Sequence, residues 1–270
     1  SDLNIISNIT EKNNKNEKIN FSKKVCLKPW GYEFLCYESN KIGIWFLKIN
    51  MNNKTSVHVH FKKDTIMLVL SGKVKLNFVD DFQIFETMDL IYIPKKKFHG
   101  IEPISEYCYL LEIEIFDLET TFSDKNDLFR LIDGYVRDKD TYQGSIQMIE
   151  NNLEKYNYFE IEKDLSTYLD DTLIEYNSNF SSNIENCFYI LLDGEFTHNY
   201  KIYKEGSIFS QFEYSNLNIN NGSLFLKVSN NYLEKNKIIN NLEELKYIKQ
   251  KYNNDKLILT SGCFDILHIG

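Results

Sequence analysis

The order of hydrophobic and polar positions predicts a chain built mainly from short β-strands. Between residues 28 and 116, aromatic and β-branched residues occur in short runs, separated by turn residues such as Ser71-Gly72 and Asp80-Asp81. The runs predicted as strands are residues 31–37, 42–49, 55–60, 65–70, 73–79, 89–93 and 108–116. So many short strands at this spacing favour an antiparallel sandwich or barrel.

The pattern after residue 116 predicts helices first and then a second group of strands. Residues 124–132 and 145–156 are predicted as helices, the second with Ile146, Ile149 and Leu153 on one face. Strands are predicted at residues 187–192, 195–203, 207–212 and 224–228, followed by a helix at 240–251 and a strand at 256–260. The string ILLDGEF at 190–196 echoes LVLSGKV at 68–74, which indicates a second barrel of the same kind.

The composition supports this β-rich interpretation and excludes several classes of protein. The chain has 18 Tyr, 19 Phe and no Ala, a bias that suits strands better than helices. The net charge of -8 argues against a nucleic-acid-binding protein. No run approaches 18 apolar residues, and the N-terminus lacks the apolar core of a signal peptide. The 5 Cys are scattered without a C-x-x-C pair, which favours a reducing, intracellular setting, so we expect a cytoplasmic protein. From the net charge and the lack of a long apolar run, we expect that it binds neither nucleic acid nor membrane.

Three of the 5 histidines have a spacing typical of a metal site. His58 and His60 alternate along one predicted strand, so both rings point to the same face. His99 comes from a later strand, after the Pro94 turn. Ligands from two strands can converge inside a small barrel; the alternative is three ordinary histidines in a β core. Imidazole suits Zn, Fe, Ni or Cu, so these ligands alone do not select the metal.

The segments around these histidines resemble the two motifs of the cupin family. The first is KTSVHVHFKKDTIMLVLSG at 54–72 and the second is MDLIYIPKKKFH at 88–99. Asn52, Met88 and Lys96 stand where the motifs have glycines. The opening KPWGYE at 28–33 is similar to the lead-in of mannose-6-phosphate isomerase-like cupins, which handle sugar phosphates.

The resemblance implies a jelly-roll β-barrel that holds a divalent metal ion (Zn, Fe, Mn or Ni) on His58, His60 and His99. The glutamate ligand of the family falls at Asp64 or Thr65 when counted from His60, but only at Thr65 when counted back from Gly72. Asp64 is therefore a candidate fourth ligand, whereas Thr65 would be a poor one.

Other polar residues near the predicted site are candidates for contact with a substrate. Glu33 is a candidate for the catalytic carboxylate that shuttles protons. Lysines at strand ends either bind a phosphorylated ligand at the mouth of the barrel or form solvated surface: Lys62, Lys63, Lys95, Lys96 and Lys97. Arg137 and Tyr142 lie in VRDKDTYQG at 136–144, which resembles a segment that follows the barrel in the sugar-isomerase-like group.

The last residues, LILTSGCFDILHIG at 257–270, resemble the start of a cytidylyltransferase-like nucleotidylyltransferase with an H-x-G-H motif. In such a strand–turn–helix unit, glycine lets the backbone approach the nucleotide, and the helix N-terminus stabilises phosphate charge. The resemblance implies nucleotide-binding roles for Gly262, Phe264, Asp265, His268 and Gly270. Because the second histidine of the motif would follow Gly270, we expect nucleotide to bind only through a domain that continues beyond it.

The predicted fold class is mainly β, with two cupin-type antiparallel barrels, a few connecting helices and a partial α/β segment. The expected organisation is a flexible arm (1–22), a metal-type cupin (23–120), a connecting segment (121–155), a degenerate second barrel (156–230), a helical linker (231–255) and the start of a nucleotidylyltransferase (256–270). The second barrel has no H-x-H, and its lone His198 is expected to be an ordinary strand residue.

Two hypotheses for function follow. The first is a metal-dependent sugar-phosphate isomerase or epimerase, fused to a nucleotidylyltransferase that makes an activated sugar or polyol. The alternative is a non-catalytic cupin module that forms a homodimer, or binds a sugar, and regulates the transferase. The intact histidine triad favours catalysis, and the missing motif glycines favour the module.

Overall fold

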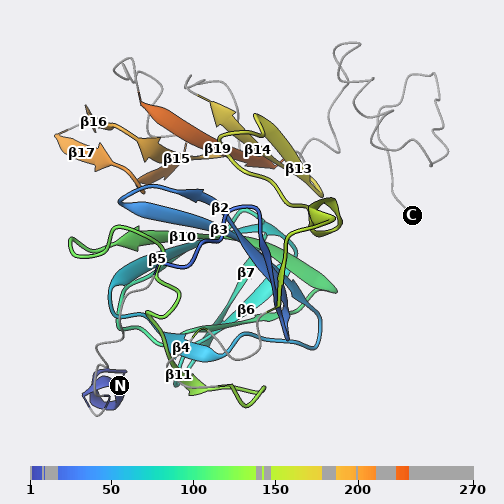
Figure 1. Ribbon diagram of the computed structural model, residues 1–270. Coiled ribbons are helices and arrows are strands. Elements are labelled where there is room, and N and C mark those ends of the chain that lie inside the picture. The colour runs from blue at the N-terminus through green and yellow to red at the C-terminus, as the bar shows by residue number, and fades with distance from the viewer. Residues whose placement is uncertain are drawn as a thin grey trace, which may run out of the picture. The chain divides into compact units, whose positions relative to one another are not determined.

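The computed structural model describes residues 2–7, 9, 18–137, 142, 147–177, 187–198, 200–210 and 223–230. Antiparallel strands dominate these residues (Figure 1), so the predicted mainly β fold class is confirmed. Every described residue belongs to one compact unit, residues 1–232. The predicted helix at 240–251, the predicted strand at 256–260 and all the nucleotide-binding candidates lie outside the described residues.

The first layer of the barrel is a seven-stranded sheet in the order β12-β1-β2-β3-β10-β5-β8. Its strands are β12 (Gln147–Ile149), β1 (Val25–Lys28), β2 (Gly31–Glu38), β3 (Ile42–Asn50), β10 (Tyr107–Phe116), β5 (Lys63–Ser71) and β8 (Leu90–Ile93). Five of them match strands predicted from the sequence. The predicted turn after β5 is also present, and Gly72 allows it by adopting a φ of 89°.

The second layer completes the barrel with two short sheets, which are β7-β6-β9 and β4-β11. Their strands are β7 (Phe82–Glu86), β6 (Lys73–Asn77), β9 (Gly100–Pro103), β4 (Val57–Val59) and β11 (Phe129–Ile132). A pair of backbone hydrogen bonds between His58 and His99 joins β4 to the start of β9, so the two sheets form one layer. The side chains between the two layers form one buried apolar cluster around Trp45, Leu47 and Val69.

A smaller sheet covers the outer face of the seven-stranded sheet (Figure 1). Its order is β13-β14-β19-β15-β18, and a hairpin β16-β17 accompanies it. The bounds are β13 (Ser166–Leu169), β14 (Thr172–Asn177), β15 (Cys187–Asp193), β16 (Glu195–His198), β17 (Lys201–Lys204), β18 (Ile208–Ser210) and β19 (Leu224–Asn230). Closure of this part into a second barrel stays a prediction, because residues 178–186 and 211–222 are outside the described residues.

This arrangement explains why β3 is apolar on both faces. Ile44 and Phe46 point outward and pack with Ile190 and Leu226 of the smaller sheet. Trp45 and Leu47 point into the barrel. A strand buried on both sides has a continuous hydrophobic run instead of a polar alternation. The seven-stranded sheet therefore serves as a shared wall, with the candidate site on its inner face.

Both helices predicted before residue 160 are wrong. Residues 129–132 form β11, which pairs with β4, and residues 147–149 form β12, which pairs with β1. A single 3-10 turn, Leu153–Tyr156, is the helical part that remains. In such short segments, edge pairing with the barrel stabilises the strand more than the weak helical spacing favours a helix. The predicted strand 195–203 is a hairpin of two strands, β16 and β17.

The N-terminal residues, predicted as part of a flexible arm, include one short helix, α1 (Asp2–Ile6). Phe21, in the segment predicted as a flexible arm, is only 3% exposed and lies edge-on to Trp45 inside the barrel, with ring centroids 4.8 Å apart. The end of this segment is therefore part of the barrel core. Within the described residues, no helix is long and apolar enough to cross a membrane.

Candidate metal centre

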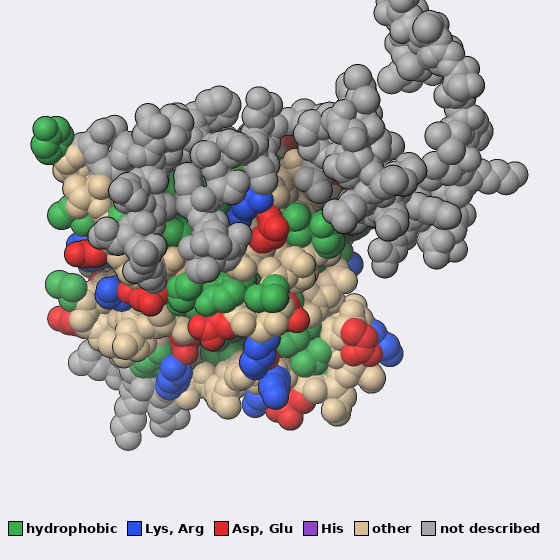
Figure 2. Space-filling view, turned by 90° about the horizontal axis from the view of Figure 1, so that it is seen from above, with side chains coloured by type: hydrophobic (Ala, Val, Ile, Leu, Met, Phe, Trp, Pro, Cys, Tyr) green, Lys and Arg blue, Asp and Glu red, His purple; other side chains and the backbone are tan. Residues whose placement is uncertain are grey.

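The three histidines of the predicted site meet inside the barrel, on its second layer. His58 is the middle residue of β4, His60 follows β4, and His99 precedes β9. Their ring centroids are 4.6 Å to 5.5 Å apart. One nitrogen from each ring lies within 4.8 Å of the other two, and no other described group of His, Cys, Asp or Glu has this metal-binding geometry. On the face of the molecule in Figure 2, no histidine is visible among the described atoms.

Hydrogen bonds to the backbone fix the same tautomer in all three rings. His58 Nδ1 lies 2.9 Å from the Ser56 carbonyl, and His99 Nδ1 lies 3.0 Å from the Lys97 carbonyl. His60 Nδ1 contacts the Asp127 carbonyl. Because a carbonyl only accepts, each Nδ1 carries the proton and each Nε2 keeps a free lone pair. This is the arrangement that orients a histidine toward a metal ion.

Two of these lone pairs have no partner. His60 Nε2 and His99 Nε2 are buried and form no hydrogen bond within the described residues. Buried polar atoms almost always have a partner, so such an orphaned pair indicates a group that binds there. The residues present therefore fit a divalent metal ion.

The electrostatics of the three rings also favour the neutral, metal-binding form. Burial lowers the pKa of His58 and His60 well below the ordinary value, and neighbouring positive charge lowers both further. Burial lowers the pKa of His99 to about 4. At neutral pH all three imidazoles are therefore uncharged and do not need to lose a proton before they bind a metal.

The structure does not bring Asp64 to the triad. Along β5, Ile66 and Leu68 face the smaller sheet while Met67 faces the barrel interior. Asp64 shares the outward parity, and its Oδ1 accepts the Lys95 backbone N–H at 2.8 Å. Thr65 has the inward parity, and its buried hydroxyl has no partner within the described residues. The position of the family's carboxylate ligand is therefore Thr65.

The three positions that lack the motif glycines keep the backbone conformation of a glycine. Asn52, Met88 and Lys96 have φ values of 64°, 72° and 65°. This left-handed region is costly for a residue with a Cβ, and more so for Met or Lys than for Asn. The loops therefore keep the shape that the motif describes, without the residues that adopt it most easily.

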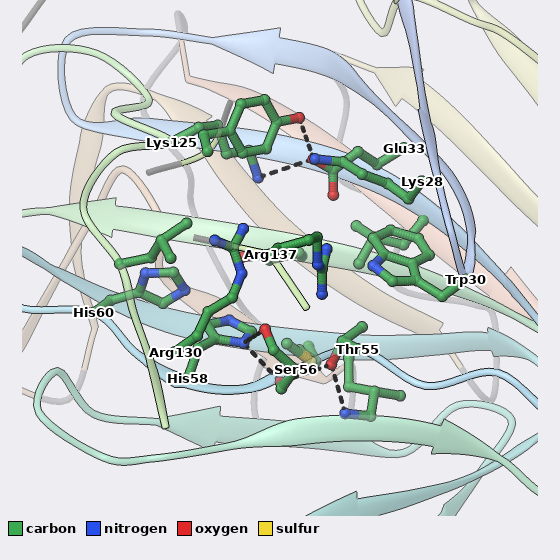
Figure 3. Close-up of a pocket in the computed structure, with 16 residues that line it drawn as sticks. Lys28, Trp30, Glu33, Thr55, Ser56, His58, His60, Lys125, Arg130 and Arg137 are labelled. Atoms are coloured by element: carbon green, nitrogen blue, oxygen red, sulfur yellow. Dashed lines mark hydrogen bonds and ion pairs between the residues drawn. The ribbon is translucent and has the colours of Figure 1, made fainter. Parts of the chain in front are cut away.

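A partly open cavity of about 70 Å³ adjoins the triad (Figure 3). In Figure 3, His58 and His60 lie on one side of the cavity, and Lys28, Glu33 and Lys125 lie across from them. Its lining residues are Lys28, Trp30, Glu33, Leu47, Thr55, Ser56, His58, His60, Met67, Ile101, Glu112, Lys125, Leu128, Arg130, Arg137 and Tyr142. A water needs about 10–15 Å³ of such space, so the cavity has room for an ion with a few small groups.

Glu33, the predicted catalytic carboxylate, lines this cavity as one partner in a buried charge cluster. Lys28 Nζ lies 3.3 Å from its carboxylate, Lys125 Nζ lies 4.0 Å away, and the Tyr142 hydroxyl donates to it. Burial raises its pKa, but these two cations and the hydrogen bond outweigh burial and hold the pKa at about 2. Burial lowers the pKa of Lys28 to about 8, although Glu33 opposes the shift. Glu33 is thus a permanently charged, fully engaged group.

Glu114, the second inward carboxylate, is engaged in the same way. It forms contacts with Lys63 and with the Ser123 hydroxyl, and an ion pair with Lys125 at 3.3 Å. Trp45 Nε1 donates to it at 3.3 Å. Lys63 is therefore a buried structural residue, not a lysine at the mouth of the barrel. The cavity cations are Lys28, Lys125, Arg130 and Arg137 instead.

Glu112, a third inward carboxylate, was missed by the sequence analysis. It lies in the centre of β10, is 6% exposed, and lines the cavity together with His58 and His60. The signal was present in the string LLEIEIF at 110–116, where Glu112 and Glu114 interrupt an otherwise apolar strand at alternate positions. Two acids on one face of a buried strand indicate a polar interior.

Comparison with known proteins gives structural neighbours only: no family model and no curated protein matches the sequence. An uncharacterized conserved protein with a double-stranded β-helix domain from Klebsiella pneumoniae is 14% identical, with 34% of this chain and 80% of that chain covered and a TM-score of 0.31. KdgF from Halomonas is 13% identical, with 34% of this chain and 83% of that chain covered and a TM-score of 0.32. A cupin-2 domain containing protein from Shewanella frigidimarina is 22% identical, with 31% of this chain and 78% of that chain covered and a TM-score of 0.28.

These similarities are too low to carry an argument about activity. The fold assignment rests instead on the two antiparallel layers and on the inward-facing histidines that join β4 to β9. The described barrel has the cupin-type jelly-roll fold.

Proposed function

We propose that this barrel is a metal-dependent enzyme that isomerises or epimerises a sugar phosphate. The observation that carries the proposal is the convergence of one ring nitrogen from each of three histidines, together with two buried Nε2 atoms, of His60 and His99, that have no partner within the described residues. An unsatisfied buried acceptor costs about 1–3 kcal/mol, and a bound ion would remove that penalty. A divalent ion bound there would supply Lewis-acid polarisation of carbonyl and hydroxyl oxygens.

The guanidinium groups of the cavity support an anionic substrate. Four cationic side chains line it (Lys28, Lys125, Arg130 and Arg137) together with the carboxylates Glu33 and Glu112, while Glu114 and Asp133 pair with Lys125 and Arg137 from outside the lining. Arg137 is held in place by Asp133, with Nη2 and Oδ1 2.6 Å apart. Guanidinium groups present paired N–H donors that match phosphate oxygens. Because the cavity holds only about 70 Å³, we expect the reacting end of the sugar to enter it and the rest to extend toward the mouth.

The test is a paired measurement of metal content and turnover. The purified full chain should retain close to one divalent ion after dialysis, and should interconvert fructose 6-phosphate and mannose 6-phosphate. The substitution His99→Ala should abolish both properties, whereas His198→Ala, outside the triad, should change neither. Metal-free wild-type protein that gains no ion on reconstitution would contradict the proposal.

A non-catalytic sugar-binding module is the second candidate, and two observations favour it. Thr65 stands where a carboxylate ligand is expected, and the cavity is small. Metal binding without turnover of either hexose 6-phosphate, combined with saturable sugar binding, would support the module in place of the enzyme.

The proposed fusion to a nucleotidylyltransferase is supported by the segment SGCFDILHIG at 261–270 alone. We propose that this segment begins a nucleotide-binding unit. Titration of CTP and ATP into a protein whose chain continues past Gly270, compared with its His268→Ala variant, tests whether the segment contributes to nucleotide binding.

A further inference from the structure

The barrel interior holds three carboxylates, and two of them are fully engaged. Glu33 is fixed by Lys28 and Tyr142, and Glu114 is fixed by Lys63, Lys125 and Ser123. A carboxylate with several permanent donors stays ionised and oriented, which suits a structural role. Neither group is free to accept and return a proton.

The third carboxylate differs from both. Within the described part of the chain, no hydrogen bond or ion pair ties Glu112 to another side chain. It nevertheless lies on the inner face of the shared wall, paired in register with Trp45 on β3 and Met67 on β5. The backbone of Glu112 is therefore held between two neighbouring strands, and its side chain lines the same small cavity as His58 and His60.

The surroundings of Glu112 oppose its ionisation. Burial raises its pKa, the neighbouring charges of Glu114 and Glu33 raise it further, and the cations Lys125 and Lys63 oppose the shift. A carboxyl whose pKa is raised takes up and returns a proton more readily than one held fully ionised. The same cavity thus contains one permanently ionised acid and one that can carry a proton.

We infer that Glu112 is the catalytic acid–base residue of this barrel and that its substrate is a hydroxy-carbonyl compound with an exchangeable C–H bond. The inference rests on the proposed function. It assigns the proton-transfer role to Glu112 in place of Glu33.

The proposed step balances without a further reactant. The ionised Glu112 removes the proton from the carbon that bears the hydroxyl next to the carbonyl. The C–H electrons form the C=C bond of an enediolate, and the carbonyl oxygen receives the negative charge. The hydroxyl proton passes to that oxygen, and protonated Glu112 then returns its proton to the former carbonyl carbon. An aldose thereby becomes a ketose, and Glu112 is ionised again.

The experiment compares Glu112→Gln with two controls in deuterated water. Metal-loaded wild-type protein should incorporate solvent deuterium into fructose 6-phosphate or mannose 6-phosphate, as detected by NMR. In Glu112→Gln, exchange should fall at least about 100-fold, with unchanged metal content and unchanged far-UV circular dichroism. Glu86→Gln, on exposed β7, controls for the loss of one carboxylate and should exchange normally. Glu33→Gln should lower the free energy of unfolding, as expected for a carboxylate that is fixed by Lys28 and Lys125.

A second readout needs no turnover. Infrared difference spectra of wild type minus Glu112→Gln should show a carboxylic-acid C=O band at a pH at which Glu33 is already ionised, and the band should vanish as the pH rises. Retained exchange in a folded, metal-loaded Glu112→Gln protein overturns the assignment of Glu112 only. Metal-loaded wild type that exchanges neither sugar overturns the proposed isomerase, and with it this inference.

Discussion

His58 and His99 exchange two backbone hydrogen bonds, of 2.9 Å and 2.8 Å, across the junction of β4 and β9. Such an antiparallel bridge sets the spacing of the two side chains through the backbone rather than through their own packing. Their ring centroids are 4.6 Å apart. Two of the three proposed ligands are therefore positioned before any ion binds, which lowers the ordering cost of metal binding.

Removal of one ligand should abolish tight metal binding while the barrel stays folded. Loss of a residue that hydrogen-bonds to a metal ligand typically lowers metal affinity about 10- to 100-fold. Because His99→Ala removes a ligand itself, we expect the affinity for Zn²⁺ to fall by more than this. The bridge to His58 uses only backbone atoms and survives the substitution. Competition with a chromophoric chelator measures the affinity. An unchanged affinity would show that His99 is an ordinary core histidine.

Insertion of a carboxylate at Thr65 should strengthen the metal site. Thr65 is 1% exposed and has an inward parity on β5. We expect Thr65→Glu to raise metal affinity at least about 10-fold, because a carboxylate oxygen adds a fourth ligand. Thr65→Gln introduces a side chain of the same size as Glu but without a charge, and it should not raise the metal affinity. Asp64→Asn should also leave it unchanged, since Asp64 accepts from the Lys95 backbone. A loss of affinity in Asp64→Asn would reverse this assignment.

The histidine site was predictable because its geometry follows from alternation along one strand. The two-residue spacing of His58 and His60 places both rings on one face whatever the rest of the fold does. The spacing of the motif that the sequence resembles, counted back from Gly72, also selects Thr65 over Asp64. By contrast, the pairing of β11 with β4 and of β12 with β1 depends on distant strands, so local helical spacing at 124–132 and 145–156 was misleading.

The charged interior was less accessible to sequence reasoning. Glu112 and Glu114 stand out in an apolar strand, but their opposite roles come from partners far away in the chain. Lys63, Lys125 and Ser123 surround Glu114, whereas Glu112 has none of them as a hydrogen-bonding partner. A one-dimensional pattern shows that a charge is buried and does not show which cation reaches it.

Acid should destabilise the barrel through Glu33. Its pKa is lowered from 4.5 to about 2 in the folded chain. A carboxyl with a depressed folded pKa contributes stability above its unfolded pKa, and this contribution is lost as the pH falls from 4.5 toward 2. We expect Glu33→Gln to cost about 3–5 kcal/mol at neutral pH, because Lys28 and Lys125 are left without this buried partner. Urea unfolding across this pH range should show a weaker acid dependence in the variant than in wild type.

Restoring the missing motif glycines should stabilise the barrel. Met88 and Lys96 have φ values of 72° and 65°, a conformation that costs a side chain with a Cβ roughly 1–2 kcal/mol. Glycine adopts it without strain but loses about 0.5–1 kcal/mol of chain entropy on folding. We therefore expect Met88→Gly and Lys96→Gly each to gain up to about 1.5 kcal/mol in the free energy of unfolding. Asn52→Gly should gain less, since Asn tolerates this region.

The matched control for these substitutions is Lys95→Gly, an adjacent exposed residue that is not among the residues with positive φ. It adds the same chain entropy without relieving strain, so it should lower the free energy of unfolding. Urea denaturation of the metal-free proteins compares all four variants without any contribution from ligand binding. If Lys96→Gly is as destabilising as Lys95→Gly, then the Lys96 loop does not have the left-handed conformation in solution. The geometry that delivers His99 to the triad would then need a different explanation, because Lys96 N–H donates to the His60 carbonyl at 2.7 Å and ties that loop to the site.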